Sequence, residues 1–255
     1  MPQPDTDPTR RFSTRVENYV RYRPGYPAKV LRILSEETGF SSAAVVADIG
    51  AGTGISTKLF LDHGNTVFAV EPNDAMRTAA ESLLGTEPQF HSIAGTAEQT
   101  TLADRSVDYV VAGQAFHWFD VAGARCECQR ILRSGGWAVL MWNTRKTDTT
   151  PFLRSYEKLL IDFGTDYAEV NHANVSALAL ESFFGGRPHY RAIPNEQVFD
   201  LAGLTGRLLS SSYVPSVEDP RYEPMLATLS RLFAEHQQDG HVRFEYDTEL
   251  YFGQI

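Results

Sequence analysis

An apolar segment that runs directly into a glycine-rich turn is the feature that most constrains this chain. Residues 43–46 are apolar, and the run ADIGAGTG follows at residues 47–54. A strand that ends in such a turn before a helix lets a ligand approach the backbone closely, with free amides at the helix start to meet anionic groups. A second apolar segment, 66–70, ends in Glu71, whose carboxylate suits the two hydroxyls of a ribose. The pairing predicts an adenosine-containing ligand.

The glycine spacing separates the ligand classes. In the dinucleotide-binding fingerprint G-x-G-x-x-G the third glycine falls three positions after the second, and counted from Gly52 that position holds Ile55. The glycines instead alternate at Gly50, Gly52 and Gly54, with Asp48 two residues before the first. This spacing argues against a nicotinamide-dependent oxidoreductase, which is kept as an alternative.

The run from Asp48 to Gly54 resembles motif I of the class I S-adenosylmethionine-dependent methyltransferases, D-x-G-x-G-x-G. Segments similar to the family's later motifs follow in the expected order. The stretch GQAFHWFD and the leader resemble a subgroup that includes trans-aconitate methyltransferase-like proteins. The resemblance is strong over residues 12–145 and looser beyond, and its segments lie at residues 12–27, 95–108, 113–120 and 130–137.

The alternation of apolar segments with helical patterns agrees with the fold that this resemblance implies. We expect an α/β, doubly wound, Rossmann-like sheet of seven strands, mostly parallel with an antiparallel last strand. Near-continuous apolar strands are typical of parallel sheets covered by helices on both faces. The expected strands are residues 45–49, 66–70, 89–93, 107–112, 137–142, 190–199 and 242–252.

A single domain over residues 1–255 is expected, because 42% apolar content is ample for one full core. Residues 1–11 are polar and proline-bearing, so they are predicted to form a flexible tail. Residues 12–27 are interpreted as an N-terminal lid segment. In methyltransferases of this type an insertion often covers the substrate, and residues 146–188 are assigned that role.

Charge and composition argue against several function classes. The formal net charge is −9, whereas proteins that bind nucleic acid usually cluster Lys and Arg. No segment reaches the roughly 18 apolar residues of a membrane span, and the start lacks a signal-peptide core, so a cytoplasmic location is predicted. Cys126 and Cys128 would point about 200° apart on one helix. They are interpreted as reduced thiols, and no metal site is expected.

The resemblance implies S-adenosylmethionine as the cofactor. The loop of Gly50, Gly52 and Gly54 is expected to hold its methionine portion. Asp48 is expected to order that loop or to reach the amino group, with simple stabilisation of the turn as the alternative. Glu71 is expected to bind the ribose hydroxyls, and its alternative is an exposed carboxylate at a strand end.

The adenine contacts depart from the family pattern. Many relatives carry an aspartate that accepts from the adenine amine, where this chain has Thr96. Glu98 or the backbone around Ala97 is expected to take that role. Gln114, directly after the fourth strand, completes the predicted cofactor-binding set.

His117 is the candidate catalytic residue, as a base or as a group that orients the acceptor. It lies just past the fourth strand, at the edge where open α/β sheets bind ligands. Trp118 and Phe119 are predicted to line the methyl pocket, where aromatic faces attract a sulfonium by ~0.5–2 kcal/mol. A structural role for the histidine and core packing for the two aromatics are the alternatives.

The leader contributes the remaining candidates, Tyr19, Tyr22 and Arg23. If it folds over the site, an arginine suits bidentate binding of an acceptor carboxylate, and the tyrosines shield the cofactor. A solvated surface helix explains the arginine equally well.

The predicted function is methyl transfer by direct displacement to a small-molecule acceptor, a carboxylate or a hydroxyl, by a monomer or weak homodimer. A catalytically silent S-adenosylmethionine-binding protein is the alternative from another class. Methylation of nucleic acid or protein ranks lower, because the N-P-P-Y motif of amino-group methyltransferases is absent after the fourth strand, where residues 114–117 read QAFH.

Overall fold

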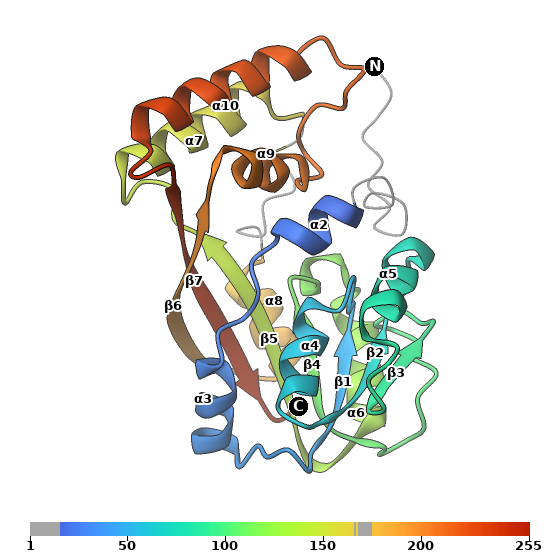
Figure 1. The fold of residues 1–255 in the computed structure, drawn as a ribbon. Helices are drawn as coiled ribbons and strands as arrows, with labels where there is room; N and C mark the ends of the chain where they lie inside the picture. The colour runs from blue at the N-terminus through green and yellow to red at the C-terminus, as the bar shows by residue number, and fades with distance from the viewer. Residues whose placement is uncertain (1–15, 166, 168–174) are drawn as a thin grey trace.

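Seven strands form one sheet through the centre of the molecule (Figure 1). The computed structural model describes residues 16–165, 167 and 175–255. The strands are β1 (Val45–Ile49), β2 (Thr66–Val70), β3 (Phe90–Ile93), β4 (Val107–Gly113), β5 (Leu132–Arg145), β6 (His189–Phe199) and β7 (Val242–Gly253). Their order is β3-β2-β1-β4-β5-β7-β6, and β7 is antiparallel to both of its neighbours. The predicted mostly parallel sheet with an antiparallel last strand is confirmed.

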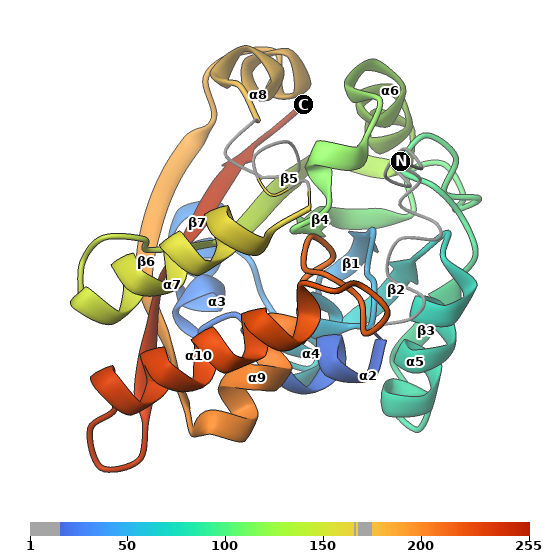
Figure 2. The ribbon, with the colours of Figure 1, turned by 90° about the horizontal axis from the view of Figure 1, so that it is seen from above.

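Helices cover both faces of the sheet, as predicted (Figure 2). On β5, the adjacent residues Leu140 and Met141 belong to the cores of opposite faces. Helices α6 (Val121–Ile131) and α8 (Ala177–Phe184) complete the first core, and α3 (Lys29–Thr38) and α4 (Ile55–Asp62) complete the second. The remaining described helices are α2 (Val16–Tyr22), α5 (Asp74–Leu84), α7 (Pro151–Phe163), α9 (Leu201–Leu209), α10 (Tyr222–His236) and the 3-10 turn η1 (Phe116–Trp118).

A cap made of α7, α9 and α10 stands over the carboxyl ends of the strands (Figure 1). It has its own core, in which Tyr156, Leu208, Leu229 and Phe244 are buried together. Strands β6 and β7 stay paired beyond the end of β5 and connect the sheet to this cap. Helix α2 contacts α9 on one side and α5 on the other, so the leader lies between the cap and the sheet.

The predicted insertion at residues 146–188 divides between two parts of the fold. Helix α7 belongs to the cap, whereas α8 packs beside α6, where Arg125 donates to the carbonyl of Phe183 at 2.8 Å. Residues 1–15, which include the predicted tail and the start of the predicted lid segment, lie outside the described residues. None of the described helices is long and apolar enough to cross a membrane.

Strand β5, at Leu132–Arg145, is longer than the predicted strand at residues 137–142. Strand β5 begins at Leu132 and not at Trp137, because Leu132 already pairs with Val107 before an irregularity shifts the register.

Candidate functional site

A cavity of about 540 Å³ lies between the carboxyl edge of the sheet and the cap, with residues of both on its wall. Its wall is built by the leader, the glycine turn, the segment after β4, the end of β5 and the cap. The cavity brings most of the predicted site residues together, although they are widely spaced in the sequence. Those on its wall are Arg23, Gly50, Gly52, Glu71, Ala97, Glu98, Gln114, His117, Trp118 and Phe119.

The glycines of the turn serve different purposes. Gly50 has a φ of 69°, and a Cβ there would lie 2.6 Å from the Cβ of Ala115, so the position requires glycine. Gly54 has a φ of 88° and precedes the first residue of α4, where a Cβ would lie 2.5 Å from Leu84 Cδ1. Gly54 is not on the cavity wall, so it shapes the turn and its packing against α5.

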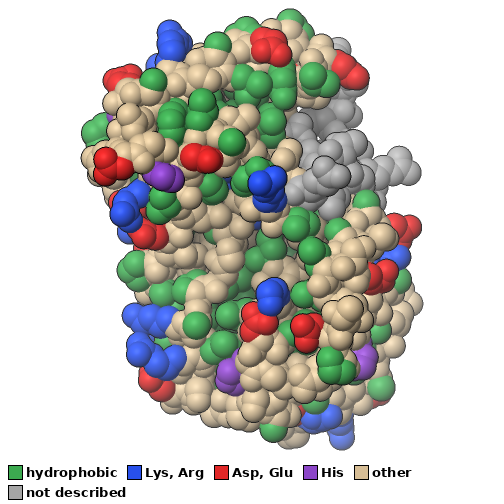
Figure 3. All heavy atoms as spheres, viewed as in Figure 1, with side chains coloured by type: hydrophobic (Ala, Val, Ile, Leu, Met, Phe, Trp, Pro, Cys, Tyr) green, Lys and Arg blue, Asp and Glu red, His purple; other side chains and the backbone are tan. Residues whose placement is uncertain are grey.

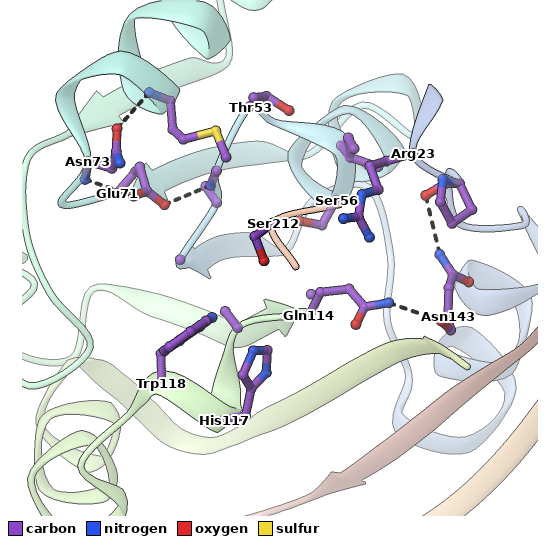
Figure 4. A pocket seen from close by; sticks show the side chains of 18 of the residues that line it. Arg23, Thr53, Ser56, Glu71, Asn73, Gln114, His117, Trp118, Asn143 and Ser212 are labelled. Atoms are coloured by element: carbon purple, nitrogen blue, oxygen red, sulfur yellow. Dashed lines mark hydrogen bonds between the residues drawn. The ribbon is translucent and has the colours of Figure 1, made fainter. Parts of the chain in front are cut away.

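Glu71 lies at the end of β2 with only 8% of its surface exposed, which excludes the exposed strand-end alternative. Its Oε2 accepts from the amide of Gly52 at 2.8 Å, and its Oε1 accepts from the amide of Asn73 at 2.8 Å (Figure 4). Burial raises the pKa of Glu71, and the two amides partly oppose that shift. Each carboxylate oxygen has a second lone pair, so the group can still accept two hydroxyl protons.

Asp48 lies beneath the glycine turn and is fully buried. Its Oδ2 accepts from Ser56 Oγ at 2.7 Å and from Thr57 Oγ1 at 2.6 Å, so the carboxylate holds the first turn of α4 against β1. Burial raises the pKa of Asp48 to about 6, against the opposing effect of these hydroxyls. Asp48 is not on the cavity wall, and its contacts join the strand before the glycine turn to the helix after it.

The segment expected to meet the adenine lies on the cavity wall as a tight turn. The backbones of Thr96 and Gln99 bond to each other, at 3.1 Å and 3.3 Å. Ala97 is buried in this turn, and Glu98 Oε1 accepts from the amide of Asp120, at the start of α6, at 2.9 Å. The start of α6, which follows His117 in the chain, thus holds Glu98 in place beside the cavity.

His117 and Trp118 lie on the short helix η1 that follows β4. Phe116 fixes this helix, because its buried ring meets the rings of Phe183 at 5.1 Å and Trp142 at 6.2 Å. His117 and Trp118 are half-buried, their ring centroids lie 4.8 Å apart, and both face the cavity across from Thr53 (Figure 4). The packing of Phe116 in the core therefore positions His117 and Trp118 at the cavity.

Asn143, at the end of β5, is a site residue that the sequence analysis missed. Its Nδ2 contacts the carbonyls of Pro24 and Gly25, both at 3.3 Å, and its own carbonyl accepts from Gln114 Nε2 at 3.2 Å (Figure 4). Its Oδ1 accepts from Thr248 at 2.5 Å. Asn143 is 4% exposed, and its amide fastens the leader to the sheet. The available signal in the sequence was a polar residue directly after the predicted strand at residues 137–142.

The leader residues separate in the structure. Arg23 lies on the cavity wall, and its Nη2 donates to the carbonyl of Ser210, at the end of α9, at 2.9 Å. Tyr22 is not on that wall, because its ring packs on Gly206 of α9, where a Cβ would lie 2.0 Å from the ring. Tyr19 belongs to α2, but its side chain lies outside the described residues.

The cap adds wall residues that the sequence analysis did not select. Arg207 and Tyr213 come from α9 and the segment after it, and Arg145 comes from the last position of β5. An arginine in the apolar helix pattern of residues 201–209 was a signal that could have identified one of them.

Comparison with known proteins supplies the family. A family model described as a methyltransferase domain matches residues 47–140. An uncharacterised methyltransferase of Mycobacterium tuberculosis is 40% identical over 139 residues, so the match spans about half of each chain, 54%. An uncharacterised methyltransferase of Schizosaccharomyces pombe is 30% identical over 241 residues, which cover 92% of this chain and 86% of that protein. The chain belongs to the class I S-adenosylmethionine-dependent methyltransferases. In this methyltransferase the matched domain ends at residue 140, so the cap helices lie beyond it.

A solved structure also resembles this methyltransferase over most of its length. It comes from Anaeromyxobacter dehalogenans, is named as a type II methyltransferase, and aligns with a TM-score of 0.70 over 91% of this chain and 98% of that one. The two sequences are 20% identical, so the likeness concerns the fold.

Proposed function

We propose that this chain transfers a methyl group from S-adenosylmethionine to an oxygen atom of a small molecule, either a carboxylate or a hydroxyl. One observation carries the proposal: a single cavity joins the Gly52–Glu71 pair on one side to His117 and Trp118 on another, beneath a cap. About 540 Å³ lies within the range of roughly 300–1,000 Å³ typical of small-molecule sites.

The residues of the glycine-rich end fit the cofactor. The buried, amide-held carboxylate of Glu71 would bind the ribose hydroxyls, and the turn at Gly52 has open space where a Cβ would stand, which leaves room for the methionine portion. The backbone at Ala97 would meet the adenine. When bound, the cofactor supplies a methyl group already activated by the positive sulfonium.

The protein's own part in the reaction is alignment and exclusion of water. Trp118 and Phe119 would line the space beside the methyl group, where an aromatic face favours a cation. The leader, which Arg23 joins to the cap and Asn143 joins to the sheet, would help the cap to hold the acceptor in line. This arrangement suits a direct displacement, which needs positioning more than covalent help from the enzyme.

His117 would act on the acceptor. A hydroxyl acceptor must lose a proton, which a neutral imidazole can take near neutral pH. A carboxylate is already deprotonated and would need only orientation. The two acceptor classes therefore place different demands on the same ring.

Charge supports a small acceptor over a nucleic acid. The formal net charge is −9, and Figure 3 shows acidic and basic side chains interspersed on the face it displays. Nucleic-acid binding usually requires a concentrated basic surface. The same proposal includes a cytoplasmic monomer or weak homodimer.

A methyl-transfer assay tests the function. The purified chain is incubated with S-adenosylmethionine labelled in the methyl group and with a panel of small carboxylic acids and alcohols. We expect a labelled ester or ether from at least one of them, with one S-adenosylhomocysteine formed per product. Binding of S-adenosylhomocysteine with no labelled product from either class would contradict the proposal and favour the binding-only alternative.

A further inference from the structure

A buried cation lies on the cap side of the cavity, and no carboxylate among the described residues pairs with it. Arg207 is 5% exposed and lies on the cavity wall. Its Nε approaches Tyr246 Oη at 3.3 Å, its Nη1 approaches the hydroxyls of Ser210 and Ser211 at 3.4 Å and 3.3 Å, and its guanidinium lies 5.9 Å from the centre of the Phe244 ring. All of these groups are uncharged, and no ion pair among the described residues includes Arg207.

Such an arrangement is costly unless something compensates for it. Removing a charge from water costs several kcal/mol in practice, on the order of the stability of a small domain, unless an opposite charge is nearby. An arginine cannot escape this cost by losing its proton. Because Arg207 borders the cavity, an anion bound there would supply the missing partner.

A second buried guanidinium on the same wall is only partly compensated. Arg145 Nη2 donates to the carboxylate of Glu157 and, at 3.0 Å, to Tyr167 Oη. Its Nη1 is buried with no hydrogen-bond partner among the described residues, and 9% of the side chain is exposed. Arg145 therefore has capacity left to donate to a ligand.

The two arginines flank one pair of aromatic rings. The guanidinium of Arg145 lies 5.3 Å from the centre of the Tyr156 ring, and that ring meets the Phe244 ring at 4.7 Å, the ring which Arg207 also approaches. The carboxylates on the cavity wall, Glu71 and Glu98, belong to the opposite end and accept backbone amides there. The cap end of the cavity is thus cationic and the cofactor end is anionic.

We propose that Arg207 and Arg145 form a subsite for a carboxylate carried by the methyl acceptor. This inference rests on the proposed function and names the substrate class, a small carboxylic acid. Guanidinium groups donate several parallel hydrogen bonds to a carboxylate, which sets the orientation of the bound acid as well as its affinity. Neither arginine belongs to the leader from which the sequence analysis expected such a contact.

The test compares acids with their uncharged amides. Acetate, benzoate and succinate are titrated by calorimetry into the chain saturated with S-adenosylhomocysteine, alongside acetamide, benzamide and succinamide. We expect at least one acid to bind tenfold or more tightly than its amide. Arg207→Gln should remove that preference by at least tenfold, Arg207→Lys should keep part of it, and the exposed control Arg243→Gln should leave it unchanged.

Each contrary result has a distinct meaning. The subsite is overturned if no acid binds more tightly than its amide in the unaltered chain, or if both Arg207→Gln and Arg145→Gln leave the preference intact. The two variants guard against the case in which one of them does not fold. It is also overturned if Arg207→Gln weakens S-adenosylhomocysteine itself by tenfold, because the anion would then be the cofactor's own carboxylate. Failure of S-adenosylhomocysteine to bind the unaltered chain would instead refute the proposed function.

Discussion

The two ends of the cavity are built in different ways. At the cofactor end, Glu71 is held by the amides of Gly52 and Asn73, all within 22 residues of one another and on backbone that the sheet fixes. At the cap end, Arg145 and Arg207 come from distant segments and are held by side chains. The first end depends on backbone geometry, which sequence changes alter little. The second depends on side chains, so we expect substitutions there to change acceptor binding without changing the first end.

Removing the imidazole of His117 should have the largest effect, because it lowers turnover and leaves the cofactor end intact. His117→Ala is expected to lower kcat for a hydroxyl acceptor by about 100- to 10,000-fold, the usual contribution of a general base. Affinity for S-adenosylhomocysteine should stay within twofold. Steady-state kinetics and calorimetry measure the two effects, with the exposed His241→Ala as control. An unchanged kcat would remove His117 from the site.

Adding a methyl group at Gly50 should disrupt the cofactor end through its backbone. Gly50→Ala forces alanine into a positive φ and places its Cβ 2.6 Å from that of Ala115. We expect the free energy of unfolding to fall by about 2–4 kcal/mol, from the left-handed conformation and overpacking together. Urea unfolding is the measurement. Gly186→Ala is the control, because nothing lies within 4 Å of its added Cβ, and an equal loss in both variants would contradict the account.

The buried carboxylate of Asp48 gives the cofactor end a pH dependence. Its pKa is raised by burial from 3.8 to about 6, so the folded state holds a proton that the unfolded state releases between these values. Stability from this group is therefore present below about pH 4 and is lost as the pH rises through 6, by up to roughly 3 kcal/mol at ~1.4 kcal/mol per pKa unit.

The variant Asp48→Asn isolates this effect, because it carries no proton equilibrium at that position. Relative to that of the unaltered chain, its free energy of unfolding should increase by about 2–3 kcal/mol between pH 4 and pH 7, because only the unaltered chain loses stability over this range. Denaturant unfolding at both pH values measures the change. A difference that stays constant with pH would show that the carboxylate does not titrate in this range.

Removing the Glu71 carboxylate should have the opposite pattern of effects from removing the His117 imidazole: cofactor binding weakens and the cap end is unchanged. Glu71→Ala is expected to weaken S-adenosylhomocysteine by about tenfold to fiftyfold, corresponding to hydrogen bonds with a charged acceptor at roughly 1.5–2.5 kcal/mol. The preference for acids over amides at the cap end should persist. Calorimetry on Glu71→Ala and on the exposed control Glu87→Ala tests this, and equal affinity in both would refute the ribose assignment.

The sheet and the cofactor end could be predicted because their signals are local. Strands β1 and β2 have the predicted bounds, since each is a short apolar run that ends at a polar or glycine-rich turn. Asn73 and Asp120, directly before α5 and α6, accept from amides three residues ahead, at 3.1 Å and 3.3 Å. Local hydrogen bonding of this kind is visible in a sequence.

The cap end could not be predicted in the same way. Its helices are amphipathic, but the pattern does not say which of them pack together. The sequence therefore did not show that Tyr22 packs on Gly206 of α9 and not in the cavity. In the sequence, Arg207 is one polar residue in an apolar helix pattern, and only the structure shows that it is buried on the cavity wall. Contacts between distant positions, such as Tyr22 with Gly206 or Arg207 with Tyr246, depend on tertiary packing, which no local pattern encodes.

The most direct test of the central claim is a calorimetric titration of the purified chain with S-adenosylhomocysteine, with NADH as a parallel titrant. The claim is that the glycine turn and Glu71 form a binding end for the adenosine of S-adenosylmethionine. It predicts one site of micromolar affinity, about −8 kcal/mol, and no binding of NADH. Binding of NADH alone, or of neither molecule, would contradict it.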